Sequence, residues 1–191
     1  MANGTDLPPP ADRRERIKIL HEQIFTLIWF AFRRLAQRLQ GYDLTQPQFV
    51  ALAALVRHGG PATMRQLTQV TFQDPPTMTG IVNRLVRAGL VERTRSEEDR
   101  RVVWVKATPE GVVLLRTIEQ HLEQEDPYQF NTMTDDEIHR MEDFLDYILT
   151  RYVTQIFRQD LPNIETAKQL LRGFARDPIA FISRYSGPKR S

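Results

Sequence analysis

Residues 64–101 read MRQLTQVTFQDPPTMTGIVNRLVRAGLVERTRSEEDRR and decide the fold. Thr63 and Gln66 have the spacing of a capping box, which predicts a helix of about two turns. Asp74 is a favoured N-cap residue and is followed directly by a proline, which the first helical position tolerates. The helix that starts there ends at Gly89, a residue suited to the left-handed C-terminal position. The stretch therefore predicts two short helices joined by a tight turn.

A charged hairpin follows these two helices. Residues 90–96 read LVERTRS and residues 102–108 read VVWVKAT, and both runs are rich in residues that favour strands. The tip between them, EEDRR, is fully charged. Two short helices followed by such a hairpin are the order of a winged helix-turn-helix. We therefore expect a mainly α fold with a small β-wing.

Longer helical patterns lie on both sides of this core. One runs from Arg13 to about Leu39 and is apolar nearly all round in its middle, and another runs from Thr45 to His58. After the hairpin, Thr108 and Thr134 each cap a further helix. The tail from residue 163 keeps apolar residues at helical spacing, and Asn163 and Asp177 are helix-capping residue types, so we expect the tail to be ordered and to reinforce a dimer.

Composition excludes several classes of protein. The chain has no cysteine, which excludes disulfides and thiolate metal sites, and its four histidines are scattered, so we expect no metal and no cofactor. The sequence contains no nucleophile elbow, phosphate loop or HExxH pattern, so we expect no enzyme. The N-terminus has no apolar h-region and no apolar run is long enough for a membrane helix, which predicts a cytoplasmic protein. Basic residues exceed acidic ones over residues 1–110, and the reverse holds after them.

One face of the second short helix and the hairpin have the chemistry of a DNA-binding surface. Small and polar residues near a helix N-terminus can read base edges in the major groove, and arginines on a thin β-ribbon can enter the minor groove. The candidate recognition residues are Pro76, Thr77, Thr79, Gly80, Asn83, Arg84 and Arg87. The candidate wing residues are Arg93, Arg95, Asp99, Arg100 and Arg101, and the candidate contacts to the DNA backbone are Thr63 and Arg65.

Three motifs, NRLVRAGLVER, the D-x-R of the hairpin tip and TPEG, occur in the order found in the multiple antibiotic resistance regulator (MarR) family, which residues 15–155 resemble. The resemblance implies that residues 77–84 lie in the recognition helix. It also implies that Arg101 enters the minor groove and that Asp99 steadies it. The first and last helices would build a dimer, and a small-molecule cleft would be lined by Phe25, Trp29 and Phe30. This chain departs from the family pattern at Pro75 and Pro76, at Gly80, and in the tail after about residue 160.

The chain is expected to divide into five parts. These are a disordered N-terminus (1–12), a helix for dimerisation and for the ligand cleft (13–40), a winged helix-turn-helix DNA-binding domain (41–107), dimerisation helices (108–158) and a helical C-terminal extension (159–191).

We expect a homodimeric, sequence-specific transcription regulator, a repressor that binds an inverted repeat in double-stranded DNA and responds to a small aromatic effector. The alternative is a winged-helix module for protein contact, without an effector. For the aromatic residues of the first helix, a place in the core or the dimer interface stays open beside the cleft.

Overall fold

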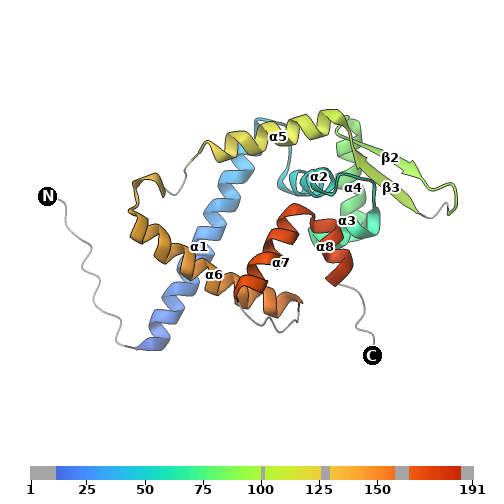
Figure 1. Ribbon diagram of the computed structural model, residues 1–191. Helices are drawn as coiled ribbons and strands as arrows, with labels where there is room; N and C mark the ends of the chain where they lie inside the picture. The colour runs from blue at the N-terminus through green and yellow to red at the C-terminus, as the bar shows by residue number, and fades with distance from the viewer. Residues whose placement is uncertain (1–11, 100–101, 126–129, 158–163, 186–191) are drawn as a thin grey trace, which may run out of the picture. The chain divides into compact units, whose positions relative to one another are not determined.

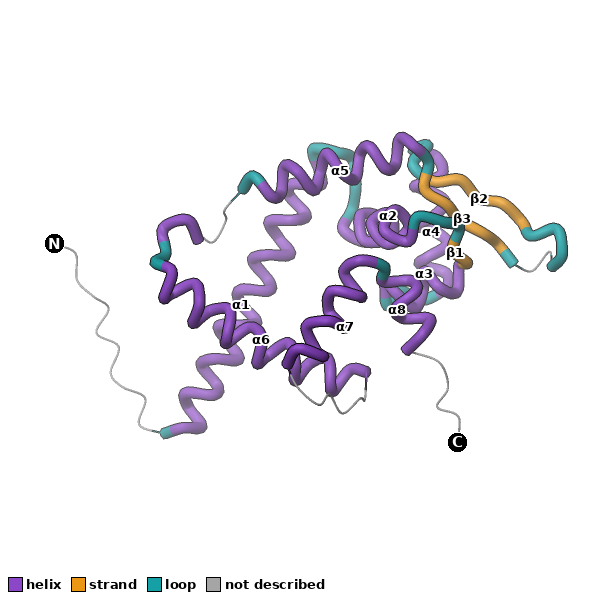
Figure 2. Tube along the Cα trace, viewed as in Figure 1, coloured by secondary structure: helices purple, strands orange, loops and turns teal. Residues whose placement is uncertain are grey.

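The computed structural model describes residues 12–99, 102–125, 130–157 and 164–185. It divides into two compact units, Met1–Gln46 and Pro47–Ser191. Helices dominate, and the strands form one small antiparallel sheet, as the tube in Figure 2 shows. The expected fold class, mainly α with a β-wing, is confirmed. The predicted disorder of the N-terminus covers residues 1–12, of which residues 1–11 lie outside the described residues and Asp12 caps the first helix.

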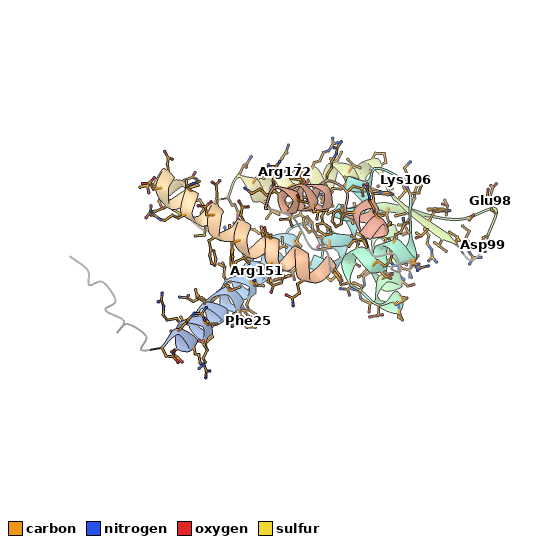
Figure 3. All side chains as sticks on the ribbon, turned by 60° about the horizontal axis from the view of Figure 1, so that its bottom comes forward. Phe25, Glu98, Asp99, Lys106, Arg151 and Arg172 are labelled. Atoms are coloured by element: carbon orange, nitrogen blue, oxygen red, sulfur yellow. The ribbon has the colours of Figure 1, made fainter. Side chains whose placement is uncertain are left out.

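The first unit is built around α1 (Arg13–Gln40), which has the predicted bounds to within one residue. Asp12 caps it, because its carboxylate accepts a hydrogen bond from the backbone N–H of Arg14 at 3.3 Å. Large apolar side chains lie on several sides of this helix, and Phe25, with 70% of its surface exposed, points away from it in Figure 3.

The second unit begins with three helices and a sheet in the predicted order (Figure 1). These are α2 (Gln46–His58), β1 (Ala62–Thr63), α3 (Met64–Thr71), α4 (Pro75–Arg87), β2 (Val91–Arg95) and β3 (Val103–Ala107). The capping box of Thr63 and Gln66 is present, and Asp74 caps α4. The turn between α3 and α4 contains Phe72 in the left-handed region, with φ of 53° and 77% of its surface exposed.

The sheet has the strand order β1-β3-β2. In the hairpin Val91 pairs with Ala107 and Arg95 with Val103, so the predicted wing is present. Ala62 of β1 pairs with Val105 on the other edge of β3. Strand β1 was not predicted; it ties the start of α3 to the base of the wing and fixes where the helix-turn-helix meets the sheet.

The core of the second unit lies between α2, α3, α4, β3 and the next helix, α5 (Pro109–Glu123). Its largest fully buried side chains on these elements are Leu52, Leu55, Leu67, Met78, Val82, Leu85, Val105, Leu115 and Ile118. Gly111 of α5 lies so close to the segment between α4 and β2 that an added Cβ would meet the carbonyl oxygen of Leu90 at 2.2 Å. Only glycine fits there, which explains the TPEG motif.

Beyond α5 come a short 3₁₀ helix η1 (Phe130–Thr132) and α6 (Asp135–Phe157). Thr134 and Glu137 form the predicted capping box, with the backbone N–H of Thr134 donating to the Glu137 carboxylate at 2.9 Å. These hydrogen bonds hold the pKa of Glu137 below its ordinary value. No helix in the described part of the chain is long and apolar enough to cross a membrane.

The C-terminal extension forms α7 (Ile164–Arg176) and α8 (Pro178–Tyr185). Helix α7 packs on α6, where Lys168 pairs with Asp146, and α8 packs on α3 with Ile179, Phe181 and Ile182 buried. Figure 1 shows α8 lying against α3. Within the chain, α8 therefore packs on the helix-turn-helix, and the role of the tail in a dimer stays a prediction.

Polar contacts fix α8 at both ends. The predicted cap Asp177 accepts from the backbone N–H of Ala180 at 2.9 Å, and its two carboxylate oxygens also lie 3.1 Å from Nδ1 of His58 at the end of α2. Ser183 lies 3.4 Å from the side-chain nitrogen of Gln66 on α3. The other predicted cap, Asn163, lies outside the described residues.

Candidate nucleic-acid interface

Helix α4 divides sharply into a buried and an exposed side. Met78, Ile81, Val82 and Leu85 face the core. The predicted recognition residues Pro76, Thr77, Thr79, Gly80, Arg84 and Arg87 are exposed, and Asn83 is half-buried. A helix whose outer side is polar and uncovered near its N-terminus can enter the major groove of DNA with that end first.

Gly80 lies in the middle of this exposed side. It has no positive φ, and a Cβ added to it would meet no heavy atom within 4 Å. The packing of the protein therefore does not require glycine at this position, although glycine inside a helix destabilises it relative to alanine. An absent side chain here allows another molecule to approach the backbone of α4 closely.

The hydroxyl groups of the recognition helix donate within the protein. Thr77 Oγ1 donates to Asp74 Oδ2 at 2.7 Å, while Asp74 Oδ1 accepts from the backbone N–H of Thr77 at 2.9 Å. These bonds, the backbone one first, hold the pKa of the Asp74 carboxyl below its ordinary value. Thr79 Oγ1 donates to the carbonyl oxygen of Pro75 at 2.9 Å.

A side-chain hydrogen bond joins the described part of the wing to the recognition helix. Arg93 of β2 donates from Nη1 to the amide oxygen of Asn83 at 3.3 Å. A guanidinium has no acceptor atom, so the oxygen of the amide, and not its nitrogen, faces the arginine. This contact joins two residues predicted independently as DNA contacts.

Two backbone hydrogen bonds join described residues on either side of the wing tip. The backbone N–H of Ser96 donates to the carbonyl oxygen of Val102 at 3.0 Å, and that of Val102 donates to Asp99 at 2.8 Å. Figure 3 shows Glu98 and Asp99 at this tip. Arg100 and Arg101 lie outside the described residues, so their predicted contact with the minor groove, and the predicted support from Asp99, stay predictions.

Several arginines of this surface have no carboxylate partner in the described part of the chain: Arg65 at the start of α3, Arg84 and Arg87 on α4, and Arg95 on β2. By contrast, Arg57 of α2 pairs with Glu119 at 2.7 Å. Thr63, the other predicted backbone contact, has its hydroxyl engaged with the Gln66 side chain at 2.9 Å. Positive charge without internal partners is available to phosphate groups.

The residues predicted for an effector cleft belong to α1 in the first unit. The rings of Trp29 and Phe30 meet edge to face, with centroids 5.1 Å apart, and the guanidinium of Arg33 lies 5.8 Å from the Trp29 ring. Phe25, Trp29 and Phe30 are each more than half exposed. No group of His, Cys, Asp and Glu side chains suited to a metal ion occurs among the residues that the structure describes.

The structure combines a helix-turn-helix with a hairpin wing. Its recognition helix is polar and uncovered, and several described arginines beside it have no carboxylate partner. These features define a winged helix DNA-binding protein of the transcription-regulator class. Residues 42–102 match the model of the MarR family. The multiple antibiotic resistance protein MarR of Salmonella typhimurium is 34% identical over 119 residues, which cover 61% of this chain and 81% of that protein. The chain belongs to the MarR family.

Two further proteins are similar to the chain. The HTH-type transcriptional repressor NicR of Pseudomonas putida is 38% identical over 98 residues, 49% of this chain and 61% of that repressor. A mutant MarR from E. coli, crystallised with operator DNA, superposes with a TM-score of 0.56 at 30% identity, covering 73% of this chain and 99% of that one. The resemblance stated from the sequence is confirmed.

Proposed function

We propose that this protein is a homodimeric repressor that binds an inverted-repeat operator, with α4 in the major groove and the wing in the minor groove. The proposal is carried by the composition of the outer side of α4. Polar groups, a glycine that the packing of the protein does not require and two arginines without a described carboxylate partner are exposed there. The MarR relative crystallised with operator DNA supports it.

The charge distribution supports contact with phosphates on both sides of the recognition helix. Arg65 lies at the N-terminal end of α3, where the helix dipole also favours an anion, and Arg95 lies on the wing. Neutralising phosphates releases counterions, so operator affinity should fall steeply with salt. A winged helix that served only protein contact would not give such a dependence.

Exposed apolar side chains on α1 and α6 support the dimer. On α6 the exposed set is Ile138, Met141, Phe144, Leu145, Tyr147, Leu149 and Tyr152. On α1 it is Ile17, Ile19, Leu20, Phe25, Leu27, Ile28, Trp29, Phe30 and Phe32. Helices with so many exposed large apolar side chains are uncommon on monomeric proteins, and a second copy of the chain would cover them. A two-fold dimer would present its recognition helices to half-sites about one helical turn apart, roughly 34 Å.

We further propose that a small aromatic effector regulates DNA binding, and this proposal rests on aromatic residues of α1. Phe25, Trp29 and Phe30 offer exposed rings, which suit a flat aromatic molecule. Trp29→Ala should weaken release of the operator by such a molecule without changing operator affinity in its absence. A loss of the dimer in this variant would assign Trp29 to the dimer interface instead.

The central experiment is selection of binding sites from a random duplex library by the full chain, followed by footprinting on the region upstream of its coding sequence. An enriched inverted repeat and a steep salt dependence are expected. Arg84→Gln should weaken binding and lower the salt slope by about one. Arg116→Gln, which removes the same charge from an exposed site on α5, is the matched control. Absence of an enriched sequence, with binding insensitive to salt, would overturn the proposal.

A further inference from the structure

Hydrogen bonds inside the protein decide which atoms α4 can offer to a base. The Thr77 hydroxyl has one proton, and that proton is donated to the Asp74 carboxylate, which cannot donate in return because its pKa is lowered and it is ionised. What Thr77 presents outward is therefore an acceptor oxygen and a methyl group. Thr79 is in the same state, because its proton goes to the carbonyl oxygen of Pro75.

Asn83, in contrast to Thr77, is left with donors and not with an acceptor. A free asparagine amide can accept from the amino group of adenine and donate to its N7 at the same time. Here the amide oxygen is held by Arg93 at 3.3 Å. An oxygen beside a guanidinium is a poor acceptor for the amino group of a base, because the cation and the amino hydrogens repel each other. The two N–H groups of the amide are left as donors.

We propose that Asp74 and Arg93 are positioning residues that set the hydrogen-bonding sense of Thr77 and Asn83, so that α4 reads an amino base at Thr77 and a keto base at Asn83. This inference rests on the proposed function, since it concerns the bases of the operator. The amino bases, adenine and cytosine, carry the donors in the major groove, whereas guanine and thymine present acceptors there. Thr77 and Asn83 are six residues apart, about 9 Å along the helix axis, so they face different base pairs.

The inference gives Arg93 a role other than that of a wing contact to the minor groove. The Asn83 contact directs its guanidinium toward the recognition helix. Arg95, two residues along β2 and on the same side of the strand, has no such contact in the described residues. The two arginines therefore form a matched pair, one that positions a base-reading side chain and one that supplies charge alone.

The test is the base preference of the full chain and of variants, measured by selection from a random duplex library. Asp74→Asn keeps a good helix cap but can donate to Thr77 Oγ1, which frees the hydroxyl proton to point outward. At one base pair of each half-site the preference for an amino base over a keto base should fall about tenfold, the value of one hydrogen bond. Glu92 is an exposed residue of β2, and Glu92→Gln removes one negative charge, as Asp74→Asn does. This control should leave the base preference unchanged.

Arg93→Met and Arg95→Met complete the design. Both remove one positive charge, so both should weaken binding to all sequences alike. Only Arg93→Met should release the Asn83 oxygen. At the base pair that Asn83 reads, the preference for adenine over guanine and thymine should then rise about tenfold.

Equal base profiles for Arg93→Met and Arg95→Met, or an unchanged profile for Asp74→Asn, would overturn the inference while leaving the proposed function intact. Failure of the unaltered protein to enrich any sequence would instead count against the proposed function.

Discussion

Replacing Gly80 with alanine should stabilise the fold and impair DNA binding. The position lies inside α4 with a backbone that alanine adopts readily, and the added methyl group meets no protein atom within 4 Å. Glycine inside a helix is about 0.8–1 kcal/mol less favourable than alanine. Gly80→Ala should therefore raise the free energy of unfolding by about that amount and the melting temperature by roughly 2–4 °C.

The same methyl group would project from the middle of the recognition surface, between Thr77 and Asn83. If the bases of the operator approach the backbone of α4 at Gly80, the methyl group must push them away. The expected loss is on the order of 1–3 kcal/mol of operator affinity, the usual value of a displaced base contact. Urea unfolding and operator titration on one preparation would measure both effects together.

Gly60→Ala is the matched control, because Gly60 also has open space around its added Cβ and lies in the loop after α2. It should leave operator affinity unchanged. An unchanged affinity in Gly80→Ala would refute the close approach of DNA at this point. A lower free energy of unfolding in Gly80→Ala would refute the packing argument itself.

Four further outcomes are expected. Gly111→Ala should lower the free energy of unfolding by about 3 kcal/mol or more in urea unfolding, because its methyl group would overlap the backbone of Leu90. Phe72→Asn should raise it by about 1 kcal/mol in the same assay, since asparagine tolerates the left-handed backbone better than an exposed phenylalanine does. Ile179→Ala should cost about 2–5 kcal/mol, and a value near zero would show that α8 does not pack on α3. Arg101→Ala should weaken operator binding, measured by titration at physiological salt, more than Asp99→Ala does, because Arg101 is predicted to enter the minor groove and Asp99 is predicted only to support it.

The starts of the helices could be predicted from the sequence because capping is local. A cap joins a side chain to a backbone N–H two or three residues ahead, so Thr63, Asp74, Thr108 and Asp177 were recognisable from the residues beside them. The hairpin was equally visible, because strand-forming residues flank a charged tip. Family motifs added the order of these elements.

Contacts between distant residues could not be predicted in this way. Strand β1 has two residues, too few for any periodicity, and it exists because Ala62 pairs with Val105. The hydrogen bond between Asn83 and Arg93 depends on how the wing folds back toward α4. Neither residue type, nor its neighbours in the sequence, predicts that arrangement. The apolar spacing of α8 predicted a helix with a buried side, but a spacing cannot name the partner that buries it.

The packing of α8 on α3 also has a consequence for biosynthesis. Gln66 and Ser183, which meet across this contact, are 117 residues apart in the chain. At 5–20 residues per second, a ribosome needs on the order of ten seconds to pass from one to the other. During that interval the nascent helix-turn-helix carries an apolar surface without its cover, so a chaperone that binds apolar segments would have its best opportunity there.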